Sequence, residues 1–209
     1  MNLSFIDPRQ LLKFSWVYNK FQKFAGAELP RREFVSQYLS SLQGGRVLDV
    51  GCGPATNLNW WPENVEYVGC DLSEEYIEFA KRNYGNRGEF YAAPVEKLKD
   101  LELKSFDVII AVALLHHLSD DEVKAFCAQA YSLIKPGGKL ITTDPCFADG
   151  DSWLTKYFTS KDRGKYVRTS EAYQKLLCES FPRQSCRMKR HRLFAIVNQA
   201  GLVVEAFRD

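Results

Sequence analysis

Several features that would assign the chain to other classes of protein are missing from its sequence. The longest apolar run, residues 108–115, is far shorter than the roughly 20 residues that cross a bilayer, so we expect no membrane insertion. Residues 1–10 hold no basic region followed by an apolar core, which argues against a secretory signal. The six cysteines form no C-x-x-C pair and lack zinc-ligand spacing with histidine, so no metal is expected. Together these absences predict a cytoplasmic protein with reduced thiols.

The overall charge is small, but its distribution along the chain is uneven. The chain has 209 residues, enough for one α/β domain, and a net charge of +2. Residues 151–192 contain eleven basic and four acidic side chains, a local net charge of +7. Such a segment can attract an anionic ligand, although a solvated surface has the same composition.

Strand-like and helix-like patterns alternate from residue 46 onward. β-Branched and apolar runs predict strands at 46–50, 67–70, 89–92, 106–112 and 139–143. Ser73 and Ser119 are expected to cap the intervening helices, the second over 120–134, and 135–138 is expected to be a turn. A helix is predicted over 170–180, and the runs 186–191 and 202–207 could close the sheet antiparallel.

This order predicts a single Rossmann-like, doubly wound α/β domain. We expect a mostly parallel seven-stranded sheet with an antiparallel edge strand, because strands joined by helices pair in parallel. Helical patterns over 10–24 and from Pro30 to Leu42 predict an N-terminal helical lid. The interpreted organisation is a lid at 1–44, a cofactor-binding core at 45–145, and an acceptor-side insertion with the sheet edge at 146–209.

The strongest chemical signal is the run Val47-Leu-Asp-Val-Gly-Cys-Gly-Pro-Ala55. Gly51 and Gly53 let the backbone turn sharply and let a ligand approach closely. Asp71 follows Gly51 by twenty residues, at the end of the next strand, where a carboxylate can accept hydrogen bonds from a ribose diol. The pattern fits either an adenine dinucleotide or S-adenosylmethionine.

Two residues favour S-adenosylmethionine. Asn57 stands near the point where a dinucleotide fingerprint has its third glycine, which lets a pyrophosphate meet the helix N-terminus. Asp49 places a carboxylate beside the turn, which suits a ligand with an ammonium and a sulfonium better than a pyrophosphate.

Between about Tyr18 and Asp144 the sequence resembles the class I S-adenosylmethionine-dependent methyltransferases. The resemblance rests on the glycine run together with Val68-Gly-Cys-Asp-Leu-Ser73, Phe106-Asp-Val-Ile-Ile110, Leu114-Leu-His-His-Leu118 and Leu133-Ile-Lys-Pro-Gly-Gly-Lys-Leu140. It implies S-adenosyl-L-methionine as cofactor and a single-domain Rossmann-like fold. It also implies a cofactor site in which the glycine turn and Asp49 border the methionine, Asp71 holds the ribose, Leu72 lies against adenine, and the backbone near Ala111 meets the methionine amino group; the turn comprises Gly51, Cys52 and Gly53.

The contacts to adenine and to the methionine carboxylate are the two parts of the implied cofactor site that the family motifs do not assign directly. Where such families often have an acid after the third strand, this chain has Ala92-Ala-Pro, so Glu96 or backbone groups near Val95 are the candidates for adenine. In the lid, Tyr18 or an arginine such as Arg32 is a candidate for the methionine carboxylate, because a guanidinium matches a carboxylate bidentately. The alternative is that Tyr18 only packs within the lid and that the arginine only faces solvent.

Three residues are candidates for catalysis: His116, His117 and Asp144, which follow the fourth and fifth strands. Histidine exchanges a proton near neutral pH and could deprotonate a hydroxyl acceptor, although in the resembling family this motif often only shapes the cofactor pocket. We therefore predict methyl transfer by in-line displacement to a small acceptor, anionic or sugar-containing, with oxygen favoured over nitrogen and carbon.

Other functions remain as alternatives at this stage. A nucleic-acid methyltransferase is disfavoured because the Asn/Asp-Pro-Pro-aromatic run of amino-methylases is missing after the fourth strand, where Leu114 to Leu118 stand, and because the basic tail lacks interleaved aromatics. Cys146 follows Pro145, but on the wrong strand for a cytosine C5 nucleophile. A non-catalytic S-adenosylmethionine-binding protein and a nicotinamide-dependent oxidoreductase are the further alternatives. The acceptor and the oligomeric state do not follow from the sequence.

Overall fold

The computed structural model describes residues 28–40, 42, 44–101, 103–160, 164–193 and 197–209. The helix expected over 10–24, and Tyr18 with it, lies outside the described residues. The helix expected from Pro30 is present as α3 (Glu28–Tyr38), which begins two residues earlier and contains the proline in its first turn.

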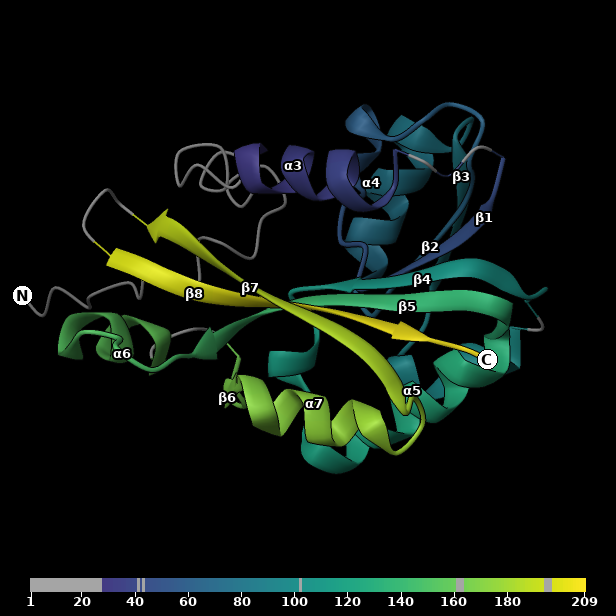
Figure 1. Cartoon of the computed structure of the whole chain (residues 1–209). Helices are drawn as coiled ribbons and strands as arrows, with labels where there is room; N and C mark the ends of the chain where they lie inside the picture. Colours follow the sequence, from purple (N-terminus) through teal and green to yellow (C-terminus); the bar gives the residue numbers. More distant parts are fainter. Residues whose placement is uncertain (1–27, 41, 43, 102, 161–163, 194–196) are drawn as a thin grey trace, which may run out of the picture.

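One sheet of eight strands runs through the molecule in the order β3-β2-β1-β4-β5-β8-β7, and the short β6 pairs with the end of β5 (Figure 1). Strands β1 to β5 pair in parallel, β6 is parallel to β5, and β8 is antiparallel to both β5 and β7. The predicted mostly parallel sheet with an antiparallel edge is confirmed, with eight strands instead of seven because β6 was not foreseen. The strands are β1 (Arg46–Val50), β2 (Glu66–Asp71), β3 (Gly88–Ala92), β4 (Phe106–Val112), β5 (Ile134–Phe147), β6 (Arg168–Thr169), β7 (Arg183–Leu193) and β8 (Val197–Phe207).

Helices cover both faces of this sheet. In Figure 1, α3 and α4 lie on one face and α5 and α7 on the other, while α6 lies near the carboxyl end of β5. Besides α3, the helices are α4 (Glu74–Tyr84), α5 (Asp120–Leu133), α6 (Trp153–Ser160) and α7 (Ser170–Cys178), with 3-10 turns η1 (Thr56–Trp60), η2 (Val95–Leu101) and η3 (Leu115–His117). Helix α6 was not predicted from the sequence.

The core is divided by the sheet into two apolar clusters. Neighbouring residues of β4 show the division: Ile109 belongs to the cluster with α5 and α7, and Ile110 to the cluster with α3 and α4. Both side chains are fully buried, since successive strand residues point to opposite faces and each face is covered by helices.

The two predicted helix caps are confirmed. The Ser73 hydroxyl accepts a hydrogen bond from Tyr76 N at 3.3 Å, at the start of α4. Ser119 forms a capping box with Glu122, whose carboxylate accepts from Ser119 N at 2.7 Å. The boxed cap fixes where α5 begins, directly after the turn that carries the two histidines.

The prediction of a free-standing turn at 135–138 is wrong. These residues belong to β5, and Gly137 N donates to the carbonyl of Arg208 while Arg208 N donates to that of Gly138, both at 3.0 Å. Gly137 has φ +79°, so it bends the strand at this point. The pairing partner lies about seventy residues away along the chain, and no local pattern reveals it.

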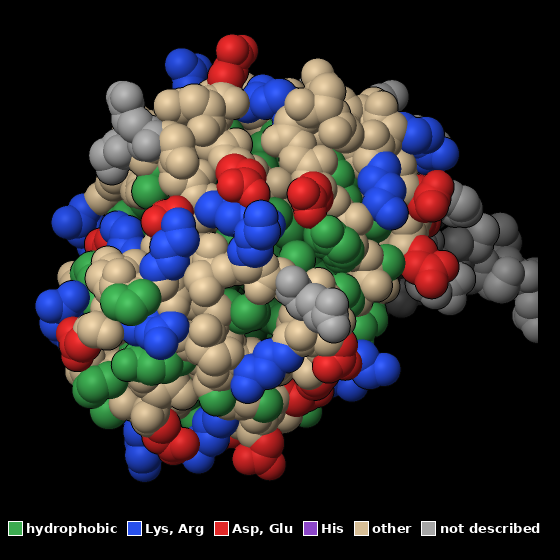
Figure 2. All heavy atoms as spheres, turned by 90° about the vertical axis from the view of Figure 1, so that its right-hand side faces the viewer, with side chains coloured by type: hydrophobic (Ala, Val, Ile, Leu, Met, Phe, Trp, Pro, Cys, Tyr) green, Lys and Arg blue, Asp and Glu red, His purple; other side chains and the backbone are tan. Residues whose placement is uncertain are grey.

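The edge at which the parallel strands begin is seen in Figure 2. Basic and acidic side chains are interspersed over this face rather than gathered by sign. Two ion pairs lie at this edge, Arg46–Glu66 with N···O 2.6 Å and Lys135–Asp107 with N···O 2.9 Å. This face therefore presents mixed charge, and ligand-binding features are expected at the opposite edge, where the strands end.

Ile109→Ala is expected to lower the free energy of unfolding by about 2–5 kcal/mol, because it removes a fully buried side chain from the central strand β4. Urea unfolding followed by circular dichroism measures the change. Met188→Ala, at a side chain 44% exposed on β7, is the control and should cost far less. Equal losses for the two variants would show that β4 is not the centre of the core.

Candidate active site

The turn after β1 is held in a conformation that glycine favours. Gly51 and Gly53 have φ of +75° and +56°, and the amides of Gly51 and Cys52 both donate to the carbonyl of Cys70 on β2. A Cβ atom at Gly53 would have nothing within 4 Å, whereas one at Gly51 would lie 3.2 Å from Leu114 Cδ1. The turn is thus open on one side and packed on the other against the segment that follows β4.

Asp71, at the end of β2, holds this turn. One carboxylate oxygen accepts from Gly53 N and the other from Ser73 N, each at 2.8 Å. Each oxygen retains a lone pair that a ribose hydroxyl could use. Leu72 beside it is 75% exposed, an apolar side chain available to the flat face of a purine. The predicted pair of Gly53 and Asp71 is therefore brought together.

Asp49 lies buried on β1, two residues before the turn. Its Oδ2 accepts from the Tyr67 hydroxyl at 2.7 Å and from Asn57 Nδ2 at 3.2 Å. Burial, and then the nearby Asp49 carboxylate, raise the pKa of Tyr67 well above its usual value, so the phenol remains a donor. The sequence did not reveal the role of Tyr67, whose place in an apolar strand reads as core.

The two cysteines of this region are unreactive thiols. Burial, and then the charges of Asp49 and Asp71, raise the pKa of Cys52 well above its ordinary value. Burial likewise raises the pKa of Cys70 to about 12, with Asp71 adding to the effect. Since the thiolate is the nucleophile, neither residue is suited to covalent chemistry at neutral pH.

The region expected to meet adenine is built from η2. The carbonyl of Val95 accepts a hydrogen bond from Gln129 Nε2 at 3.2 Å. Glu96 is exposed in the first turn of η2. On the methionine side, Ala111 pairs with Thr142 of β5, while the pairing between β1 and β4 ends at Asp49 and Ile110. The β1-facing backbone of Ala111 therefore lies just past that pairing, beside the glycine turn.

The second carboxylate of the site is Asp144, near the end of β5. Its Oδ1 accepts from His116 N at 3.1 Å and lies 2.7 Å from His116 Nδ1. Both residues are buried, and Asp144 Oδ2 has no hydrogen-bond partner among the described residues. Two of the three predicted catalytic residues are thus in direct contact.

His117 lies beside this pair but is exposed. The centroids of the His116 and His117 rings are 4.2 Å apart, and η3 carries both residues. Leu114, just before η3, is the residue that packs against Gly51. The histidines therefore lie at the same edge of the sheet as the cofactor turn.

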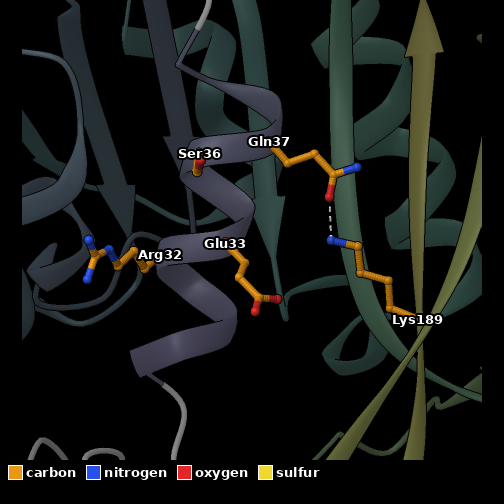
Figure 3. Close-up of a pocket in the computed structure, with 5 residues that line it drawn as sticks. All are labelled: Arg32, Glu33, Ser36, Gln37 and Lys189. Atoms are coloured by element: carbon orange, nitrogen blue, oxygen red, sulfur yellow. Dashed lines mark hydrogen bonds between the residues drawn. The ribbon is translucent and has the colours of Figure 1, made fainter.

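Arg32 lines a different hollow. This cavity of about 430 Å³ lies between α3 and β7, and its lining contains none of the glycine-turn residues. In Figure 3 the Arg32 side chain points away from Lys189, whose Nζ donates to Gln37 Oε1 at 2.5 Å. The structure does not bring Arg32 together with the rest of the predicted site; the lining residues are Arg32, Glu33, Ser36, Gln37 and Lys189.

Comparison with known proteins agrees with this geometry. Residues 47–138 match the family model described as a methyltransferase domain. The chain is 31% identical over 148 residues to the ubiquinone biosynthesis O-methyltransferase of Idiomarina loihiensis, an alignment that covers 65% of this chain and 59% of that relative. It is also 31% identical over 172 residues to phosphoethanolamine N-methyltransferase 3 of Arabidopsis thaliana, with 80% of this chain and 34% of the relative covered. The chain thus spans less than two thirds of the length of either relative.

Solved structures share the fold. The magnesium protoporphyrin IX methyltransferase of Synechocystis, solved with bound S-adenosylhomocysteine, superposes with a TM-score of 0.68 at 18% identity, covering 93% of this chain and 95% of that one. The S-adenosylmethionine-dependent methyltransferase SibL, in its apo form, gives a TM-score of 0.71 at 16% identity, covering 90% and 57%.

The fold, the glycine turn and Asp71 therefore match those of class I S-adenosylmethionine-dependent methyltransferases. The match of residues 47–138 to the methyltransferase domain model agrees with the family resemblance seen in the sequence, and the residues around the turn suit S-adenosylmethionine. The donor set fits this cofactor: a turn that is open at Gly53, a carboxylate for a diol, an exposed apolar side chain, and the buried carboxylate of Asp49, which suits a cationic ligand.

The described part of the chain has neither a membrane-spanning helix nor a cluster of metal ligands. None of its helices has the length and apolar character needed to cross a membrane. No group of three or more His, Cys, Asp or Glu side chains there could hold a metal ion.

Asp71→Asn is expected to weaken binding of S-adenosylhomocysteine about 10- to 100-fold, because an amide cannot replace both charged acceptor oxygens that hold Gly53 and the ribose. Isothermal titration calorimetry measures the affinity. Glu63→Gln, which changes the same charge before β2 at the far edge of the sheet, is the control. Unchanged affinity in Asp71→Asn would remove Asp71 from the cofactor site.

Alkylation by iodoacetamide at neutral pH should separate the cysteines into two groups. The exposed Cys178 and Cys186 are expected to react first, and the buried Cys52, Cys70, Cys127 and Cys146 only after unfolding. Peptide mass spectrometry locates the label. Rapid modification of folded Cys146 would restore the nucleophilic-cysteine alternative.

Proposed function

We propose that the chain transfers a methyl group to a hydroxyl of a small-molecule acceptor, with His116 as general base. The observation that carries this proposal is the contact of 2.7 Å between His116 Nδ1 and Asp144 Oδ1. A carboxylate bonded to one ring nitrogen fixes the tautomer and the orientation of the imidazole, the arrangement known from catalytic triads.

An oxygen acceptor follows from what this pair can do. A hydroxyl carries its proton at neutral pH and must lose it as the new C–O bond forms, so a base within hydrogen-bond reach accelerates the transfer. Burial of both side chains keeps bulk water from the carboxylate and strengthens its interaction with an imidazolium. These features support a general base rather than a residue that only shapes the cofactor pocket.

Each group of the site has one role in the proposed reaction. S-adenosylmethionine supplies a methyl group already activated by its positively charged sulfur. His116 accepts the proton of the acceptor hydroxyl at Nε2, while Asp144 accepts the Nδ1 hydrogen bond and stabilises the imidazolium. Asp71 and the glycine turn supply orientation, which aligns the acceptor oxygen with the bond that breaks.

The names of the relatives support oxygen without deciding it. The Idiomarina relative is named an O-methyltransferase and the Arabidopsis relative an N-methyltransferase, at the same identity. The acceptor class therefore rests on the His116–Asp144 pair. We place the acceptor at the edge formed by the ends of β4 and β5, so that residues 45–145 bind cofactor and the segment from 146 contributes acceptor contacts.

An anionic group on the acceptor is the second part of the proposal, and exposed lysines support it. Lys156 on α6 and Lys165 are exposed near this edge. The remaining basic residues of 151–192 support it less, because Arg168 is buried and Arg183 pairs with Asp209 at 3.6 Å. A carboxylated or sugar acid acceptor fits this arrangement.

The direct test compares probes of each acceptor type. Formation of S-adenosylhomocysteine is measured with 3,4-dihydroxybenzoate and glucuronate as hydroxyl probes and phosphoethanolamine as the amine probe. Turnover on a hydroxyl probe supports the proposal. Turnover on the amine alone overturns the oxygen assignment, and cofactor binding without turnover on any probe favours a binding protein.

His116→Gln is expected to lower kcat about 10²- to 10⁴-fold, the range typical of general-base catalysis, while binding of S-adenosylhomocysteine is retained. Steady-state kinetics on the best probe and calorimetry measure the two quantities. His117→Gln, at the exposed neighbouring ring, should cost much less.

A further inference from the structure

The guanidinium of Arg168 is buried against η3, the turn that carries the two histidines. Its residue begins β6, where Arg168 pairs with Cys146 two residues after Asp144. The side chain is 8% exposed, although a guanidinium carries its charge at all working pH values. Burying such a group is costly unless its donors are bonded, so its partners identify what it is there to hold.

All five N–H donors of Arg168 have acceptors. Nε and one Nη2 hydrogen go to Asp120 Oδ1 at 2.9 and 2.6 Å. Nη1 donates to the carbonyls of Leu115 at 3.0 Å and Tyr166 at 2.9 Å, and Nη2 donates to that of Leu118 at 2.7 Å. Leu115 and Leu118 are the residues on either side of His116 and His117, so one guanidinium fixes the backbone at both ends of the histidine pair.

The chain just before Arg168 also lies against His116. Tyr166 N donates to the carbonyl of His116 at 3.0 Å. A Cβ atom at Gly164 would overlap Cδ2 and the carbonyl oxygen of His116, so this close approach requires glycine. We name residues 164–168 the strap. The ring atoms of His116 nearest to the strap are Cδ2 and Cγ.

We propose that Arg168 is a positioning residue, which sets the orientation of the His116 imidazole for catalysis by anchoring both the histidine turn and the strap. Asp144 fixes the Nδ1 edge of the ring from β5, and the strap lies against its Cδ2 and Cγ atoms. Arg168 joins the two, because it is attached to β5 through β6 and to the turn through its side chain. The inference rests on the proposed role of His116 as base.

The geometry distinguishes this role from a general structural one. A buried arginine that only stabilises the fold would bond to whatever carbonyls are near, whereas here two of its three carbonyl partners bracket the histidines. Its carboxylate partner, Asp120, is the first residue of α5 and is 68% exposed, so that contact also ties the turn to the start of α5. The set of partners converges on one short turn.

Three variants test the proposal. Arg168→Lys keeps the charge but cannot supply the forked donors. Gly164→Ala pushes a methyl group against His116, and Gly45→Ala is its control, because a Cβ there meets no atom closer than 3.5 Å. Lys175→Met, which removes an exposed charge on α7 outside the strap, controls for charge.

Kinetics should show a loss in kcat with little change in cofactor binding. Arg168→Lys and Gly164→Ala are expected to lower kcat about 10- to 100-fold, the scale of a displacement of about 1 Å in a catalytic group, with the Kd for S-adenosylhomocysteine within about twofold of wild type. In a His116→Gln background the same Arg168→Lys change should cost less than about twofold, because residues acting through one group are not additive. An equal loss in both backgrounds overturns the proposal.

A spectroscopic measurement separates this inference from the proposed function. The Nδ1 proton of His116, hydrogen-bonded to Asp144, is expected as a low-field proton signal that broadens by faster exchange with water in Arg168→Lys and Gly164→Ala but not in the two controls. If His116→Gln retains full kcat, the general-base proposal fails; the proton signal then still shows whether Arg168 orients the ring. An unaltered signal in Arg168→Lys overturns the positioning role.

Discussion

The bond from the Asp144 carboxylate to His116 is the interaction on which the candidate site depends. One buried oxygen accepts from both the backbone amide and the imidazole of the same residue, so the turn after β4 cannot shift without losing two charge-assisted hydrogen bonds at once. The second oxygen has no hydrogen-bond partner among the described residues. Since a buried carboxylate is costly to leave unpaired, the hydrogen bonds from His116 stabilise the fold at this edge.

The same arrangement, an aspartate at the end of one strand that holds the loop after the neighbouring strand, occurs twice in the sheet. Asp71, at the end of β2, holds the loop that follows β1, and Asp144, at the end of β5, holds the loop that follows β4. Strands β1 and β4 are neighbours at the centre of the sheet, where the strand order reverses, and ligands of open α/β folds bind at this point. The contact between Gly51 and Leu114 shows that the two anchored loops meet there. The proposed cofactor and acceptor sites are thus adjacent because β2 and β5 restrain the loops that follow β1 and β4.

Much of this could be predicted from the sequence, and the failures share a physical cause. Strand β4 and the caps Ser73 and Ser119 are local patterns, and the glycine turn with Asp71 is a pattern of short range. The bend at Gly137 pairs with Arg208, and the partners of Arg168 lie about fifty residues earlier, so neither is encoded in neighbouring residues. A buried arginine and a solvated one look the same in a sequence. Tyr67 was missed for the converse reason, because an aromatic residue in an apolar strand is normally core and its hydroxyl bond to Asp49 is invisible there.

The basic segment illustrates how a charge count differs from a surface potential. Residues 151–192 carry a net charge of +7, which alone would suggest an extended anionic partner. In the fold, Arg168 is enclosed by backbone carbonyls and Asp120, Arg183 faces Asp209, and Lys189 bonds to Gln37 on the far side of β7 from α7. The cations are divided between two faces of the sheet and its interior, so their fields do not add at one place. Among the described side chains, Arg168, Arg183 and Lys189 do not form one continuous row of charge. The net charge of the segment therefore does not by itself describe the surface that these described residues present.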